Sequence, residues 1–261
     1  MSDKRQAWRL IDTGPGDGAA NMAVDEALLN RFIPGWSAPV LRLYEWAPPA
    51  LSLGRFQKRE EVLDTARCAA AGVPIVQRIT GGGVIYHGKE LTYSLVCSPV
   101  HVPPAASIKD SFRVLTSFLL RFYQKLGLDA AYAVAHPSSD KTVLGTRTDF
   151  CFAGRESYDI LVEGRKIGGN AQRRQREVIF QHGSIPLANE ALRGASFLRH
   201  PPEAVDEVAG ALADFRVRRR IADLKPLLVD AFRETIGGAL LEDSLTDGER
   251  EDAAAGAARK A

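Results

Sequence analysis

The sequence predicts an α+β protein with a mixed, mostly antiparallel sheet and flanking helices. Three observations lead to this prediction. Strand-like segments outnumber helical ones, they gather around one long amphipathic helix at 107–127, and 45% of the 261 residues are hydrophobic, which is ordinary for a soluble protein with a real core. Strands and helices that cluster separately are typical of α+β folds. We expect a single domain over 1–245, with helices from about 203, and a disordered low-complexity tail over 246–261.

The N-terminal half supplies a helix and most of the expected sheet. Apolar residues recur at helical spacing from Asp17 or Gly18 to Phe32. A second helix is expected over 59–72, ended by Gly72. Strands are expected over 40–46, 50–54, 73–80 and 90–98. The last of these strands should place Leu91, Tyr93, Leu95 and Cys97 on one face, because side chains alternate along a strand.

The second half begins with the central helix. Ser107 and Asp110 form a start that resembles a capping box, and Gly127 supplies the stop. Residues 158–169 read as a hairpin that turns at Glu163-Gly164. A further strand is expected over 177–187, and helices over 203–237.

Composition excludes several classes of protein. The net charge is +2, and the basic run at 216–225 reads as a solvated helix face, so we expect no nucleic-acid partner. The chain shows neither a secretory leader nor an apolar run long enough to span a membrane, so we expect no membrane association. Cys68, Cys97 and Cys151 form no CxxC pair, which fits free thiols in the reducing cytoplasm.

Residues 78–94 read "RITGGGVIYHGKELTYS", and the three glycines raise the question of a site. They match neither a Walker loop nor a dinucleotide-binding loop. A tight loop between strands is one interpretation. The other is an anion site, because Arg78 lies beside exposed backbone amides. His87 could line a pocket, although a lone histidine is more often a satisfied, half-buried side chain.

These residues resemble the lipoate-protein ligase A and octanoyltransferase family. The resemblance extends to "IDTGPGDGAANMAVDEALL" and "YDILVEGRKIGGNAQRRQREVIFQHGSIPL", so that it covers roughly residues 8 to 190. It implies a biotin/lipoate ligase-like catalytic domain that attaches an octanoyl or lipoyl group to a lysine of a carrier domain. It also implies an acyl site lined by Arg78, Gly81, Gly82, Gly83, Val84, Ile85, Tyr86, His87, Gly168 and Gly169, with no metal in the transferase branch.

Lys166 and Cys151 are the candidate catalytic residues. Lys166 follows an apolar strand and precedes Gly168-Gly169, at the point where the family motif has its acyl-contacting lysine. There it could stabilise negative charge on the acyl oxygen. Cys151 lies between Phe150 and Phe152, where the transferase branch of the family has its nucleophile. A nearby ammonium group would favour the reactive thiolate. Buried thiols are the simpler interpretation of Cys68 and Cys97.

The resemblance therefore favours an octanoyl or lipoyl transferase that works through a Cys151 thioester and needs no cofactor. Its expected partners are an acyl carrier protein or another acyl donor, and the lipoyl domains of 2-oxoacid dehydrogenases or the glycine cleavage carrier protein. The chain beyond residue 200 is short for the second domain that ligases carry. An ATP- and Mg²⁺-dependent lipoate–protein ligase is the alternative enzyme. A non-catalytic acyl- or carrier-binding protein is the alternative from another class.

Overall fold

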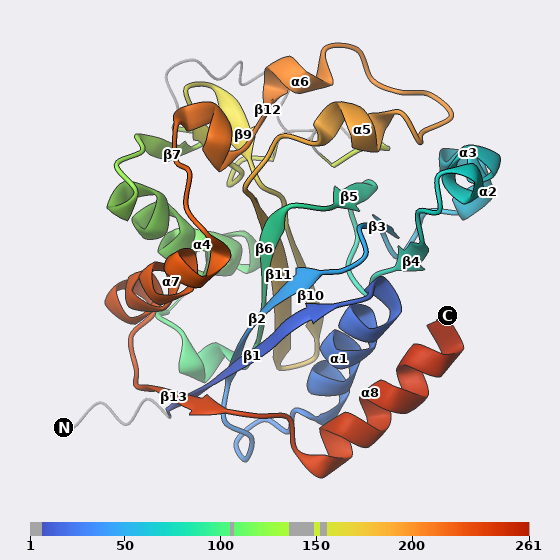
Figure 1. Cartoon of the computed structure of the whole chain (residues 1–261). Helices are drawn as coiled ribbons and strands as arrows, with labels where there is room; N and C mark the ends of the chain where they lie inside the picture. The colour runs from blue at the N-terminus through green and yellow to red at the C-terminus, as the bar shows by residue number, and fades with distance from the viewer. Residues whose placement is uncertain (1–6, 105–106, 136–148, 152–155, 261) are drawn as a thin grey trace.

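A six-stranded sheet forms the centre of the protein, seen in a computed structural model that describes residues 7–104, 107–135, 149–151 and 156–260 (Figure 1). The strand order is β10-β11-β6-β2-β1-β13. The first three pairings in that order are antiparallel, and β2-β1 and β1-β13 are parallel. This arrangement confirms the α+β fold with a mixed, mostly antiparallel sheet. The strands are β1 (Trp8–Gly16), β2 (Val40–Trp46), β6 (Glu90–Cys97), β10 (Asn170–Gln175), β11 (Val178–Pro186) and β13 (Leu240–Asp243).

Two small sheets lie against the main one and carry the motifs. The first has the order β4-β3-β5, with strands Ile75–Gln77, Ala50–Leu53 and Ile85–His87. The second has the order β12-β9-β8-β7, with strands Ala209–Gly210, Arg165–Ile167, Ile160–Val162 and Ala130–Tyr132. Strands β8 and β9 form the expected hairpin. Its turn residues Glu163 and Gly164 have φ of 50° and 79°, as a two-residue hairpin turn requires.

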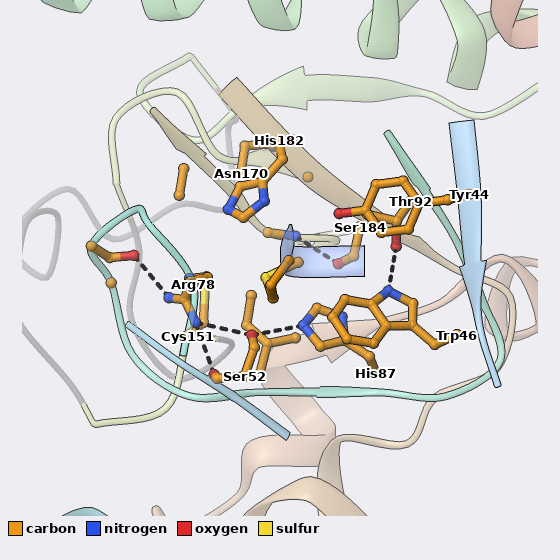
Figure 2. A pocket seen from close by; sticks show the side chains of 17 residues that line it. Tyr44, Trp46, Ser52, Arg78, His87, Thr92, Cys151, Asn170, His182 and Ser184 are labelled. Carbon is orange, nitrogen blue, oxygen red and sulfur yellow. Dashed lines mark hydrogen bonds between the residues drawn. The ribbon is translucent and has the colours of Figure 1, made fainter. Parts of the chain in front are cut away.

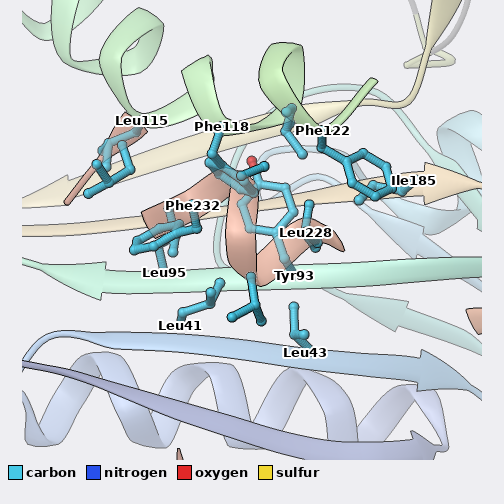
Figure 3. Packing of buried hydrophobic residues seen from close by; sticks show 14 of the residues in the cluster. Leu41, Leu43, Tyr93, Leu95, Leu115, Phe118, Phe122, Ile185, Leu228 and Phe232 are labelled. Atoms are coloured by element: carbon cyan, nitrogen blue, oxygen red, sulfur yellow. The ribbon is translucent and has the colours of Figure 1, made fainter. Parts of the chain in front are cut away.

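One face of the main sheet packs against α4 (Ile108–Lys125) and α7 (Ile221–Thr235) (Figure 3). The side chain of Ser107 accepts the Asp110 N–H at the start of α4, which confirms that helix start. The apolar face of β6 lies in this core as expected, and the cluster includes Leu91, Tyr93, Leu95, Cys97, Leu115, Phe118, Phe122, Leu228 and Phe232. Burial of these side chains is the main source of stability on this side.

The other face carries α1 (Gly18–Arg31), which in turn packs against α8 (Asp247–Lys260) (Figure 1). The prediction of a disordered tail is therefore wrong. A Cβ on Gly256 would lie 3.1 Å from Ala23 Cβ, so small residues let the two helices approach closely. Arg31 pairs with Asp252 at 2.6 Å. An alanine-rich segment with little apolar pattern can thus fold when a helix with small residues lies beside it.

The predicted helix over 59–72 is broken into α2 (Arg59–Val62) and α3 (Thr65–Ala70). Leu63 leaves the helix to form an isolated bridge with Leu198, and the Asp64 side chain caps α3 by accepting the Arg67 N–H. The remaining short elements are η1 (Pro99–His101), α5 (Ala191–Ala195), α6 (Val205–Val208) and η3 (Leu212–Phe215). Within the described ranges, no helix has the length and apolar character needed to cross a membrane.

Candidate active site

The candidate site is a pocket between the main sheet and the β4-β3-β5 sheet (Figure 2). Strand β2 contributes aromatic side chains, and β10 and β11 contribute polar ones. The glycine loop and Cys151 complete the wall. The lining residues are Met22, Tyr44, Trp46, Ser52, Arg78, Gly81, Gly82, Ile85, His87, Thr92, Cys151, Gly169, Asn170, Ala171, His182, Gly183 and Ser184.

Arg78 organises the glycine loop from inside the protein. Its side chain donates to the carbonyl oxygens of Gly81 and Gly83 at 2.8 and 2.7 Å, and to Ser52 O at 2.9 Å. Burial lowers the pKa of Arg78 to about 10, and the adjacent Cys151 acts in the opposite direction. Arg78 therefore stays a cation at neutral pH. Its Nε is buried and has no hydrogen-bond partner among the described residues.

The glycines are needed for this arrangement. Gly82 has φ of 94°, and a Cβ there would lie 3.0 Å from Arg78 Nη2. Gly168 has φ of 89°, and its Cβ would lie 2.2 Å from Ser184 O. Both values of φ favour glycine over any residue with a side chain.

Cys151 is held directly beside the glycine loop. Its N–H donates to Val84 O at 3.0 Å, and Val84 N–H donates to Asp149 O at 2.7 Å. A Cβ on Gly169 would lie 3.0 Å from Cys151 Sγ, so Gly169 leaves room for the thiol. Cys151 is partly exposed and lines the pocket, whereas its neighbour Phe152 lies outside the described residues.

The other two thiols lie in the hydrophobic core. Cys97 is part of the core under α4, and burial raises its pKa to about 12. Cys68 is the buried residue of α3, and burial raises its pKa as well. A thiol must ionise and be accessible to act as a nucleophile, and both burial and the raised pKa count against this role for Cys68 and Cys97.

Lys166 lies on β9 with only 3% of its surface exposed. Its Nζ lies 2.7 Å from Asp159 Oδ2 and donates to Cys151 O at 2.9 Å. Burial acts to lower the pKa of Lys166, but the Asp159 carboxylate and Cys151 outweigh it, so the pKa is raised. Lys166 is therefore an ammonium ion that contacts the backbone of Cys151. Its partner Asp159, directly before β8, was missed in the sequence because nothing there marks an aspartate as buried.

Strand β5 divides the predicted residues between two sides. Ile85 and His87 line the pocket, whereas Tyr86 faces away and stacks on Phe197 with ring centroids 6.0 Å apart. His87 is buried and fully bonded. Its Nε2 lies 2.7 Å from Ser52 Oγ, its Nδ1 lies 2.8 Å from Glu90 Oε1, and its ring stacks on Trp46 at 3.9 Å.

Three other predicted residues contribute backbone or packing rather than pocket surface. Gly83 accepts a hydrogen bond from Arg78, Val84 packs in the core under β5, and Gly168 lies against Ser184 O. The motif thus combines residues that line the pocket with residues that hold its wall.

Sequence reasoning missed His182, which lines the pocket from β11. Its Nε2 lies 2.7 Å from Thr80 Oγ1, and its Nδ1 lies 3.5 Å from Asp25 Oδ2. Burial lowers the pKa of His182, although Asp25 opposes that shift. The imidazole is therefore neutral at pH 7. The "QHGS" segment that carries His182 was quoted for its resemblance, but the residue itself had no assigned role.

The fold and this pocket define a lipoyl protein ligase A/B catalytic domain, and the model of that family matches residues 17–240. The chain belongs to this family. Among individual relatives, it is 38% identical to octanoyltransferase LipM of Kyrpidia tusciae, over 95% of this chain and 94% of that protein. It is 37% identical to octanoyltransferase LipM of Bacillus subtilis, over 78% of this chain and 74% of that protein.

Solved structures of ligases share the same fold. The chain is 26% identical to a lipoate-protein ligase A bound with ATP, with a TM-score of 0.81, covering 97% of this chain and 95% of that one. A bi-partite lipoate protein ligase from Thermoplasma acidophilum is 24% identical with a TM-score of 0.79, covering 98% of this chain and 93% of that one.

Proposed function

We propose that this protein transfers an octanoyl group to the acceptor lysine of a lipoyl domain through a thioester on Cys151. The octanoyltransferase activity is supported by the LipM relatives, which align with most of the chain. One structural observation supports the route through Cys151. This thiol lines the pocket beside two buried cations, Arg78 and Lys166, whereas Cys68 and Cys97 are sealed in the core.

In the first half-reaction, the Cys151 thiolate attacks the carbonyl carbon of an acyl thioester. A new carbon–sulfur bond forms, the bond to the donor sulfur breaks, and the donor leaves as a thiolate that takes up the proton Cys151 released when it ionised. Negative charge gathers on the carbonyl oxygen before the donor leaves. Preorganised cations and N–H donors in a dry pocket stabilise such charge strongly. Arg78 lines the pocket and stays a cation at neutral pH, so its positive charge is available for this task.

In the second half-reaction, the neutral amine of the acceptor lysine attacks the Cys151 thioester. The carbon–nitrogen bond forms, the Cys151 thiolate leaves, and the nitrogen gives up a proton to solvent. An amide is more stable than a thioester, so the transfer proceeds without ATP. Lys166 contributes by holding the Cys151 carbonyl and by placing positive charge next to the departing thiolate.

Acyl carrier protein is the proposed donor, and the lipoyl domains of 2-oxoacid dehydrogenases or the glycine cleavage carrier protein are the proposed acceptors. The alternative is a lipoate–protein ligase, which the structural likeness to an ATP-bound ligase keeps open. Incubation of the protein with octanoyl-acyl carrier protein and a lipoyl domain, with and without ATP, separates the two by intact mass. We expect octanoylation of the lipoyl domain without ATP. Octanoylation that depends on ATP and free octanoate would identify a ligase.

A further inference from the structure

Two arginines flank the chain just before the glycine loop. The N–H of Arg55 donates to Thr80 O at 2.8 Å, and the side chain of Arg173 on β10 reaches Ile79 O at 3.5 Å. Gly81 and Gly82, the next residues of the chain, line the pocket together with Cys151. The backbone of Arg55, just after β3, and the side chain of Arg173 on β10 therefore contact adjacent residues of the chain, next to the glycines that line the pocket.

Neither Arg55 nor Arg173 forms an ion pair with a carboxylate of the described residues. Burial lowers the pKa of Arg173, and the nearby charge of Arg55 lowers it further. Glu26 acts in the opposite direction but is paired with Lys260 at 2.9 Å. An anion between the two guanidinium groups would relieve their repulsion.

An exposed aromatic ring lies beside Arg55 and the glycine loop. Phe56 is 84% exposed, and its ring is 4.0 Å from where a Cβ of Gly81 would be. The guanidinium carbon of Arg55 lies 5.6 Å from the centre of that ring. The rim thus offers positive charge next to an apolar surface, which suits a ligand that carries both an anion and a hydrocarbon segment.

We propose that Arg55 and Arg173 form a phosphate-binding site that recognises the arm of a phosphopantetheine-type thioester donor. This inference rests on the proposed function, because only a donor of this kind brings both a thioester and a phosphate. The thioester reaches Cys151 inside the pocket, while the phosphate stays at the rim. Guanidinium groups suit phosphate because their planar N–H groups can bind two oxygens at once.

The test compares two donors that differ only in the phosphate: S-octanoyl-pantetheine and S-octanoyl-4′-phosphopantetheine. The readout is the single-turnover rate of Cys151 thioester formation, followed by intact mass with no acceptor present. For the wild-type protein we expect the phosphorylated donor to react about 10- to 100-fold faster at subsaturating concentration, as expected for charge-assisted hydrogen bonds. In the double variant Arg55→Gln/Arg173→Gln, this ratio should fall close to one while the reaction with the uncharged donor is unchanged.

A matched control removes two positive charges from the adjacent surface. Lys58 pairs with Glu61 at 2.7 Å, and the Arg59 side chain reaches Ile75 O at 3.5 Å. The variant Lys58→Gln/Arg59→Gln should keep the wild-type ratio. If the ratio of the two donor rates also falls in this control, general surface charge explains the preference for phosphate. The proposed Arg55/Arg173 site would then be wrong.

The remaining outcomes separate this inference from the proposed function. Equal rates for the two donors in the wild-type protein, or a ratio that persists in the Arg55/Arg173 variant, would overturn the phosphate site while leaving the transferase intact. Thioester formation with neither donor would overturn both. If the Arg55/Arg173 variant instead loses only acyl-adenylate formation from octanoate and ATP, the phosphate belongs to a nucleotide and the donor assignment is wrong.

Discussion

Two buried ion pairs of nearly equal geometry serve different parts of this protein. Arg42 and Asp25 lie 2.7 Å apart with about 1% of each side chain exposed, and Lys166 and Asp159 lie 2.7 Å apart with 4% and 2% exposed. The first pair connects β2 to α1 behind the pocket. The second pair lies beside Cys151. Distance and burial alone therefore do not distinguish a structural pair from one at the site.

The difference lies in the remaining contacts of each cation. Arg42 also donates to Asn21 at 2.8 Å and to Thr13 at 3.1 Å, while Asp25 accepts from Ser94 at 2.7 Å. That network also reaches the pocket wall, because Asp25 accepts from the Tyr44 hydroxyl at 3.0 Å and lies 3.5 Å from His182 Nδ1. Within the described part of the chain, the hydrogen bonds of Arg42 itself go to Thr13, Asn21 and Asp25 and not to Cys151. Lys166 instead donates to the backbone of the residue that carries the reactive thiol. We infer that the first pair holds the fold and the pocket wall, and that the second contributes both to stability and to the chemistry at Cys151.

The largest effect should come from Lys166→Met. Transfer should fall about 10²–10³-fold, because the positive charge beside the Cys151 thiolate and the hydrogen bond to the Cys151 carbonyl are lost together. Stability should fall by about 3–5 kcal/mol, because Asp159 is left as a buried, unpaired carboxylate. Single-turnover octanoylation and urea denaturation measure the two losses separately.

The double variant Lys166→Met/Asp159→Asn sharpens this prediction. It removes the uncompensated charge, so we expect most of the stability to return while transfer stays low. Recovery of transfer together with stability would show that Lys166 only holds the fold.

The same test at the other pair should give the opposite pattern. Arg42→Met should cost about 3–5 kcal/mol of unfolding free energy, because Asp25 loses its cation in the core. At a temperature where the variant is folded, the rate of Cys151 acylation should stay within a few-fold of wild type. A loss as large as that of Lys166→Met in the folded variant would abolish the distinction between the two pairs.

A smaller effect is expected in the glycine loop. Gly82→Ala should slow acylation about 10-fold or more, because strain at a positive φ costs about 1–2 kcal/mol and the new Cβ would press on Arg78. Gly35→Ala is the matched control, since Gly35 has φ of 82° in an exposed turn with nothing within 4 Å. That control should lose stability but acylate at the normal rate. Equal rates in the two variants would mean that the loop is only a turn.

The smallest effect concerns the pH dependence of stability. Burial lowers the pKa of His182 below its ordinary value of 6.5, so the unfolded chain binds a proton there at a higher pH than the folded protein does. This histidine therefore contributes stability that is complete above pH 6.5 and is lost as the pH falls below it. Urea denaturation from pH 7.5 to 5 should show a shallower decline for His182→Gln than for wild type. An unchanged slope would mean that the proton uptake occurs elsewhere.

Much of the fold was predictable because short-range patterns suffice for it. Alternation identified the buried face of β6, Ser107 marked the start of α4, and Glu163-Gly164 marked the hairpin turn. The family motifs also identified the residues around the glycine loop. Whether those residues line the pocket follows from the pleat of β5, which sends Tyr86 to the opposite side from His87.

The buried acids and the C-terminal helix were not predictable in this way. Asp25 and Asp159 resemble solvated residues in the sequence, because burial depends on partners 17 and 7 positions away at Arg42 and Lys166. Helix α8 has hardly any apolar stripe, and it folds against α1 through small side chains and the Arg31–Asp252 pair. The burial of these acids and the folding of α8 depend on tertiary contacts, which local sequence patterns do not reveal.

The most direct test of the central claim is the chemistry of Cys151 itself. Wild-type protein mixed with an octanoyl thioester donor alone should gain the mass of one octanoyl group, and hydroxylamine should remove it, as expected of a thioester. Cys68→Ser and Cys97→Ser should gain the same mass if they fold. Cys151→Ala should gain none and should not modify a lipoyl domain. Transfer by Cys151→Ala at the wild-type rate, particularly if it required ATP and free octanoate or lipoate, would contradict the account.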